Sequence, residues 1–80
     1  MSIFNNDQYT RAATVTPSDS VALPTLAYGL YVGGAGNVAL VTEGGDAVTL
    51  TAVPVGSVIR LSINQIKATG TTATNLVAVW

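Results

Sequence analysis

The sequence of 80 residues contains no histidine and no cysteine, and it has only 3 Lys or Arg and 4 Asp or Glu. These charged residues make up 9 % of the chain, against roughly 25 % in an average soluble domain. Without His or Cys there is no His-assisted nucleophile, no common zinc site and no disulfide. Three cations and a net charge of -1 give no surface that follows a phosphate backbone. We therefore expect no catalytic residues, no metal, no cofactor and no nucleic-acid partner.

Long hydrophobic runs are also missing. The longest uncharged stretch, residues 20–42, includes Pro24 and several glycines, so it is not built as a lipid-exposed helix. Residues 1–10 lack the cationic start and apolar core of a signal peptide. We expect no membrane partner, and a product that is made in a cytoplasm.

The residues that are present favour β structure. Twenty-six residues are β-branched, namely 11 Val, 11 Thr and 4 Ile, and such residues favour strands. Turn residues recur between short segments with period-two alternation. The predicted strands are residues 13–16, 27–32, 37–42, 47–53, 58–66 and 75–80. The predicted fold class is all-β: a small antiparallel β-sandwich or β-barrel of about six short strands, with little or no helix.

The faces of these strands are predicted from the same alternation. Residues 27–32 place Tyr28 on one face with the apolar residues Leu30 and Val32. Residues 47–53 place Val48, Leu50 and Ala52 opposite two threonines, and residues 58–66 place Ile59, Leu61 and Ile63 opposite polar residues.

The first eleven residues differ from the rest of the chain. Residues 1–11 are polar but include Ile3, Phe4 and Tyr9, whereas residues 12–80 form a single predicted β domain. Residues 1–11 are either a frayed terminus or an N-terminal arm whose Ile3 and Phe4 dock on a neighbouring subunit. With Trp80, which is predicted to lie in the core or at a subunit contact, Ile3, Phe4 and Tyr9 are the candidate interface residues.

Two short motifs have a chemical and a structural interpretation. Glu43 and Asp46 flank Gly44 and Gly45. They are too few for a calcium site, and a glycosidase pair would need a cleft, so a hairpin turn with both glycines at positive φ is expected. Residues 33–36 (GGAG) have no following helix and no Lys-Ser/Thr pair, which favours a tight β turn over a phosphate-binding loop.

The cations and aromatic residues are scattered. Arg11, Arg60 and Lys67 are expected to be solvated. Tyr28, Tyr31 and Trp80 would be the aromatic residues of a sugar-binding surface. Because Tyr28 and Tyr31 are three residues apart, they face opposite sides of a strand and do not line one site together.

Four blocks of the sequence, in this order, carry a resemblance: residues 13–19 (ATVTPSD), 30–38 (LYVGGAGNV), 53–56 (VPVG) and 67–75 (KATGTTATN). They resemble the small β proteins of tailed-phage and gene-transfer-agent particles known as head-spike base or capsid decoration (cement) proteins. The resemblance covers about residues 12–80. It implies a virion structural protein on the head exterior, a symmetric homo-oligomer (trimer or pentamer) that binds the major capsid protein, with a fibre protein as a further partner.

The small size of the chain agrees with this expectation. A domain of 80 residues with no disulfide and no metal is expected to be marginally stable alone, so association is the remaining source of stability. The alternative function is a glycan-binding or adhesive β module of a phage fibre or cell surface.

Overall fold

A computed structural model describes residues 9–80 of the chain. These residues form seven β-strands and no helix. The strands are β1 (Ala12–Thr14), β2 (Gly29–Gly34), β3 (Gly36–Thr42), β4 (Ala47–Val53), β5 (Val58–Ile59), β6 (Ile63–Ile66) and β7 (Thr74–Val79).

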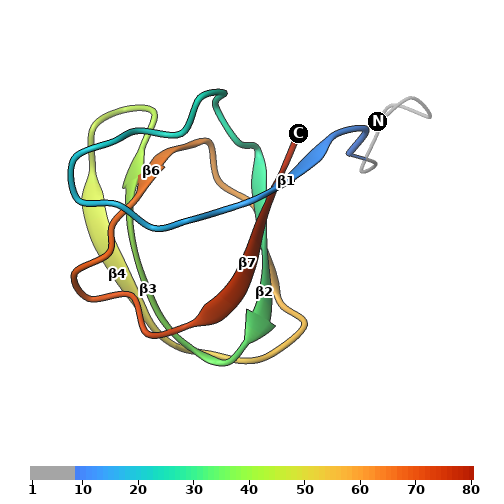
Figure 1. Cartoon of the computed structure of the whole chain (residues 1–80), viewed down its shortest axis with the longest axis vertical. Helices are drawn as coiled ribbons and strands as arrows, with labels where there is room; N and C mark the ends of the chain where they lie inside the picture. Colours follow the sequence, from blue (N-terminus) through green and yellow to red (C-terminus); the bar gives the residue numbers. More distant parts are fainter. Residues whose placement is uncertain (1–8) are drawn as a thin grey trace.

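The strands form two antiparallel sheets that face each other across the core (Figure 1). Sheet A has the strand order β1-β7-β2-β5, and sheet B has the order β4-β3-β6. The β3–β4 hairpin stays within sheet B, whereas the chain changes sheet after β2, β4, β5 and β6. The predicted all-β, sandwich-like fold class is confirmed.

The core lies between the two sheets and is built from branched aliphatic side chains. In sheet A the register places Leu30 opposite Ala78 and Val32 opposite Leu76, and all four are buried. In sheet B, Leu40 lies opposite Ile66. The fully buried large side chains are Leu30, Leu40, Ile63, Ile66, Leu76, Val32 and Val38. No polar or charged residue is buried within residues 9–80, so the interior is held by apolar packing.

The GGAG motif joins β2 to β3 at a corner and does not form the predicted tight turn. β2 pairs with β5 and β7 while β3 pairs with β4 and β6, so the chain passes from sheet A to sheet B here. The corner lies directly against residues 72–75. A Cβ atom added at Gly33 would lie 2.7 Å from the Asn75 carbonyl oxygen, and one at Gly36 would lie 2.6 Å from the Ala73 nitrogen. The glycines are needed because backbone packs against backbone.

Threonine hydroxyls complete the edge of β3 where β6 has ended. Lys67 N donates to the Ala39 oxygen at 2.8 Å, which continues the β3–β6 ladder by one bond. The Thr71 hydroxyl then accepts from Ala39 N at 3.0 Å, and the Thr72 hydroxyl accepts from Asn37 N at 2.8 Å. Residues 67–73 therefore follow β3 without forming a regular strand.

The predicted strand over residues 58–66 is wrong as a single element. It is divided into β5, which pairs with β2 in sheet A, and β6, which pairs with β3 in sheet B. Residues 60–62 cross between the sheets, where Ser62 O accepts from Glu43 N at 2.8 Å and Leu61 is 37 % exposed. Because Ile59 and Ile63 belong to the same core, the period-two pattern runs through the crossing.

Two predicted faces also need correction. On β4 the alternation ends at Ala52, which has a φ of 54° and lies in a bulge held by Asn37, whose Oδ1 accepts from Ala52 N at 2.9 Å. Val53 is buried in its place. Tyr28 precedes β2 and is 53 % exposed, so it does not share the buried face of Leu30. In the β3–β4 hairpin, only Gly45 of the two glycines has a positive φ.

The corner can be tested with two alanine substitutions. Gly36→Ala is expected to lower the free energy of unfolding by about 1–3 kcal/mol, because its Cβ would meet backbone atoms of Thr72 and Ala73. Gly44→Ala is the matched control, since the nearest atom to its Cβ would be 3.9 Å away. Urea unfolding followed by circular dichroism measures both; equal losses would contradict the backbone contact.

The bulge at Ala52 can be tested by an opposite change. Ala52→Gly removes the strain of a left-handed alanine, about 1–2 kcal/mol, and adds back about 0.5–1 kcal/mol of unfolded-state entropy. We expect a gain in stability of about 0.5–1 kcal/mol, the difference between these two contributions. The control Ala47→Gly, in the regular part of β4, should lower stability; thermal unfolding of the two variants should therefore shift in opposite directions.

Candidate interaction surface

The residues that most often carry chemistry are not gathered in one place. Residues 9–80 contain no group of three or more His, Cys, Asp or Glu that is able to hold a metal ion. Glu43 and Asp46 are exposed in the β3–β4 hairpin, where Thr42 N donates to the Asp46 backbone oxygen at 2.9 Å. No helix in this part of the chain has the length and apolarity to cross a membrane.

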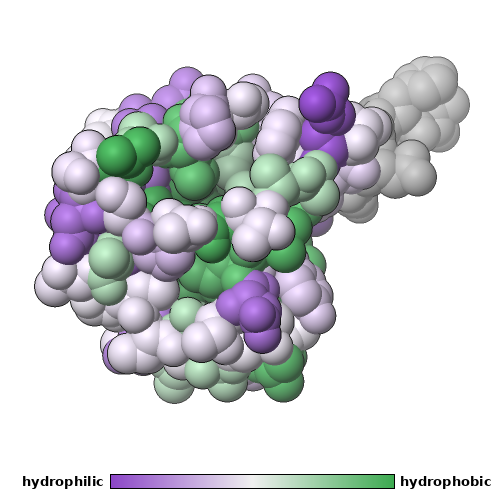
Figure 2. Space-filling model, viewed as in Figure 1, coloured by the Kyte–Doolittle hydropathy of each residue, from purple (hydrophilic) through white to green (hydrophobic). Residues whose placement is uncertain are grey.

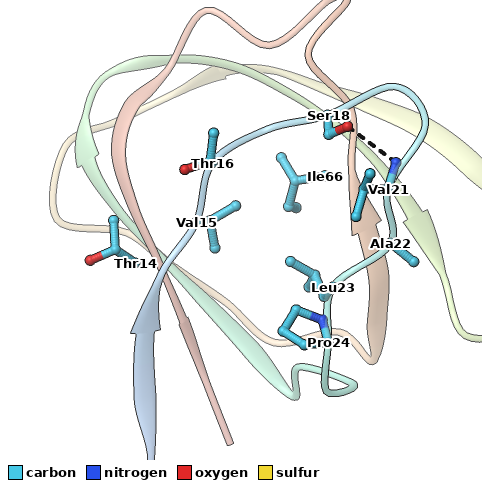
Figure 3. Close-up of a pocket in the computed structure, with 9 residues that line it drawn as sticks. All are labelled: Thr14, Val15, Thr16, Ser18, Val21, Ala22, Leu23, Pro24 and Ile66. Carbon is cyan, nitrogen blue, oxygen red and sulfur yellow. Dashed lines mark hydrogen bonds between the residues drawn. The ribbon is translucent and has the colours of Figure 1, made fainter.

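A groove opens beside β1, between residues 14–18 and residues 21–24 (Figure 3). It has a volume of about 370 Å³. Val15, Leu23 and Ile66 point into it from the two walls and from β6, whereas Thr14 points away. Figure 2 shows apolar atoms deep between paler residues near the middle of this face.

The groove continues toward the chain end as a smaller space of about 50 Å³. The two spaces share Thr14, Val15, Leu23 and Pro24, and the smaller one is also lined by Ala78 and Trp80. None of the lining residues carries a charged side chain. We call the two spaces together the β1 groove.

Hydrogen bonds fix the walls of the β1 groove. Ser18 N donates to the Ile66 oxygen at 2.9 Å, and the side-chain nitrogen of Gln65 donates to the Ser18 oxygen at 2.8 Å. The Ser18 hydroxyl accepts from Ser20 N at 3.2 Å and from Val21 N at 3.1 Å. Leu23 N donates to the Asn64 oxygen at 2.9 Å. Both ends of the loop are therefore tied to β6, and the groove is formed within the single chain.

A second apolar surface lies on the outer face of sheet A. Tyr31 is paired with Val58 on one side and Val77 on the other, and directly paired residues share a face. Tyr31 is 40 % exposed and Val58 is 47 % exposed. We call Tyr31, Val58 and Val77 the outer row. It is an uncharged surface on a protein that has few charges.

The structure places two of the four predicted interface residues shortly before β1 and directly after β7. Thr10 N and Arg11 N both donate to the Trp80 oxygen at 2.8 Å, and half-buried Trp80 packs against the core. Half-buried Tyr9 covers Gly29, because a Cβ there would lie 3.0 Å from its Cζ. Ile3 and Phe4 lie outside the described residues, so the arm stays a prediction.

Sequence reasoning missed the β1 groove. Its walls come from residues 14–24, which show no alternation, and its floor comes from Ile66, far along the chain. The one available signal is Pro24, which closes a stretch of small apolar residues, Val21, Ala22 and Leu23, with no strand pattern. The outer row has a clearer signal, since Tyr31 alternates with Leu30 and Val32.

Comparisons with known proteins place this fold. No family model matches the chain, and none of the curated proteins matches it. Among solved structures, a chain from the capsid of a native GTA (gene-transfer agent) particle, computed with C5 symmetry, matches with a TM-score of 0.82 and 31 % sequence identity. The match covers 100 % of this chain and 100 % of the capsid particle chain.

The match over both full lengths defines a class: small, two-sheet β proteins found in capsid particles. At this identity and coverage the relationship is one of family and not of fold alone. The chain belongs to the same family as the GTA capsid particle chain.

Asp19 stabilises the far end of the groove wall. Its carboxylate accepts hydrogen bonds from the Thr69 hydroxyl at 2.6 Å and from Thr69 N at 2.9 Å. These bonds lower the pKa of Asp19 below its ordinary value of 3.8, and the bond from the Thr69 hydroxyl has the largest effect. The charge of Lys67 adds a smaller effect in the same direction. The folded state therefore favours the ionised form, which stabilises the fold above pH 3.8.

This contribution is lost as the pH falls through the lowered pKa of Asp19. Asp19→Asn should lower the melting temperature at pH 7, and the difference from the wild type should shrink below about pH 4, where the protonated acid resembles the amide. Asp46→Asn controls for the loss of a carboxylate elsewhere. Thermal unfolding between pH 2 and pH 7 measures the effect; a difference that does not depend on pH would contradict the role of the charge.

Proposed function

We propose that this chain is a non-enzymatic virion structural protein that binds the outside of a phage-type capsid as a symmetric homo-oligomer, as a decoration or head-spike base subunit. The observation that carries the proposal is the full-length match to a GTA capsid particle chain. The four sequence blocks that resemble head-spike base and decoration proteins support it independently of the fold.

The surface of the molecule is suited to permanent contact with other subunits. The outer row and the β1 groove are apolar and lack charged side chains, so burying them removes apolar area from water without desolvating ions. Exposed apolar surface on a small domain marks an interaction site. We assign the outer row to the capsid contact and the half-buried Tyr9 and Trp80 to contacts between subunits.

The partners follow from the same proposal. They are other copies of this chain, the major capsid protein and, for a spike base, a fibre protein. A trimer and a pentamer both agree with the sequence. A closed ring of five copies would be compatible with the C5 symmetry with which the related particle was computed.

The proposal is tested by binding the purified protein to capsids that lack it. We expect the protein to sediment as an oligomer at micromolar concentration and to co-sediment with such capsids. A stable monomer that does not bind capsids would refute the proposal. Copy number per particle, measured by quantitative gel, then separates a spike base at the vertices from a decoration protein over the whole shell.

The outer row is tested by a matched pair of tyrosine variants. Tyr31→Glu places a charge in the outer row and should weaken capsid binding about tenfold or more. Tyr28→Glu adds the same charge at a tyrosine that is more exposed and precedes β2, and binding should change little. Circular dichroism checks that both variants fold. Equal losses would remove the outer row from the capsid contact.

A further inference from the structure

The backbone of β1 has an open edge beside the β1 groove. Arg11 and Trp80 exchange both backbone hydrogen bonds, at 2.8 and 2.9 Å, and Val15 N donates to the Leu76 oxygen at 2.9 Å. Along an antiparallel strand, every second residue is hydrogen-bonded to the neighbouring strand, and the residues between them point their N–H and C=O groups away from that strand. Ala12 and Thr14 therefore direct these groups away from β7. No residue from 9 to 80 forms a hydrogen bond with them on that side.

An open strand edge next to an apolar groove is the arrangement that binds an added strand. The edge supplies main-chain hydrogen bonds, and the groove takes alternate side chains. The small end of the groove lies at Trp80 and the large end at Ile66, so it runs along the same edge. Its volume of about 370 Å³ lies near the lower end of the roughly 300–1,000 Å³ of ligand pockets. Its lining offers hydroxyls but no charged group with which to orient a small polar ligand.

The start of the described chain lies on the opposite side of β1. Thr10 and Arg11 are bonded to Trp80, the residue after β7, and the ring of Tyr9 covers Gly29 of β2. Figure 1 shows residues 9–11 running away from the loop that forms the groove wall. The described chain therefore begins on the β7 and β2 side of β1 and not at its open edge.

The composition of residues 1–8 fits an added strand. They contain no glycine or proline and one charged side chain, Asp7. Eight extended residues span up to about 28 Å, more than the length of β1 and the residues after it that line the groove. Ile3 and Phe4 are adjacent and face opposite sides of a strand, so one enters the groove while the other covers the outer face of the added strand.

We propose that residues 1–8 of one copy add as a strand to the free edge of β1 in the next copy, with Ile3 or Phe4 in the β1 groove. This deepens the proposed function, because it rests on a homo-oligomer and names its contact. Tyr9, at the start of the described chain, and the groove lie on opposite sides of β1, so an arm of one copy in the groove of the next makes a head-to-tail contact. Repeated head-to-tail contacts close into a ring when the rotation allows it.

The test uses two full-length variants, each with one half of the contact removed. Ile3→Ser with Phe4→Ser removes the apolar groups of the arm. Thr14→Pro removes an N–H that points to the open edge and places a ring there, and proline is tolerated on edge strands. Thr14→Val is the matched control because it keeps the N–H.

We expect each variant to be monomeric in sedimentation velocity at concentrations where the wild type and Thr14→Val are oligomeric. Mixed together, the two variants should form a one-to-one heterodimer, since Thr14→Pro keeps a working arm and the serine variant keeps an open groove. A single contact cannot close a ring, so the mixture should stop at the dimer. Native mass spectrometry identifies the species.

Three results would overturn the proposal. The first is that the serine variant, whose changes lie outside residues 9–80, remains oligomeric. The second is that both variants are monomeric but do not associate when mixed at ten times the concentration at which the wild type assembles. The third is that Thr14→Pro stays oligomeric but no longer binds capsids, which would assign the groove to a segment of the capsid protein. In the first and third cases the homo-oligomer of the proposed function stands. A wild type that is monomeric and does not bind capsids refutes the proposed function itself.

Discussion

The backbone of the β2–β3 corner lies directly against the backbone of residues 72–75, at a place where the chain passes between the two sheets. The separation is below 3 Å for a Cβ at Gly33 or Gly36, so no side chain larger than hydrogen fits. Both segments carry the chain from one sheet to the other, and residues 72–75 lead into β7, which lies between β1 and β2. The absence of side chains at Gly33 and Gly36 is therefore a condition for the two crossings to pack against each other.

The low charge of the chain has a structural counterpart in its threonines and asparagines. Hydroxyls of Thr71 and Thr72 and the side chain of Asn37 accept backbone N–H groups that a longer strand would have paired. Within residues 9–80 no buried side-chain polar atom is left without a hydrogen bond. Neutral side chains thus supply hydrogen bonds to the backbone N–H groups. When the apolar parts of the surface are covered, few hydrogen bonds to water are lost.

Alternation was sufficient to predict the all-β fold and the approximate positions of most strands, because each strand has one face in the core. It failed where the path of the chain, and not the burial of side chains, determines the structure. A glycine-rich segment is typical of a tight turn as well as of the corner, and the alternation of Ile59 and Ile63 continues through a change of sheet. Of the candidate site, the sequence predicted Tyr9 and Trp80 as contact residues, and their role in an interface stays a prediction. The β1 groove depends on contact between residues 14–24 and Ile66, which are far apart in the sequence, so no local pattern predicts it.

The bulge at Ala52 shortens one open edge of the molecule. The two sheets have four outer strands, and the bulge limits the regular edge of β4 to residues 47–51. β1 has three residues and β5 has two, and β6 is bonded to the loop that contains Ser18 and Leu23. Every open edge of the described strands is therefore short, which is one way in which β proteins limit indiscriminate edge-to-edge aggregation.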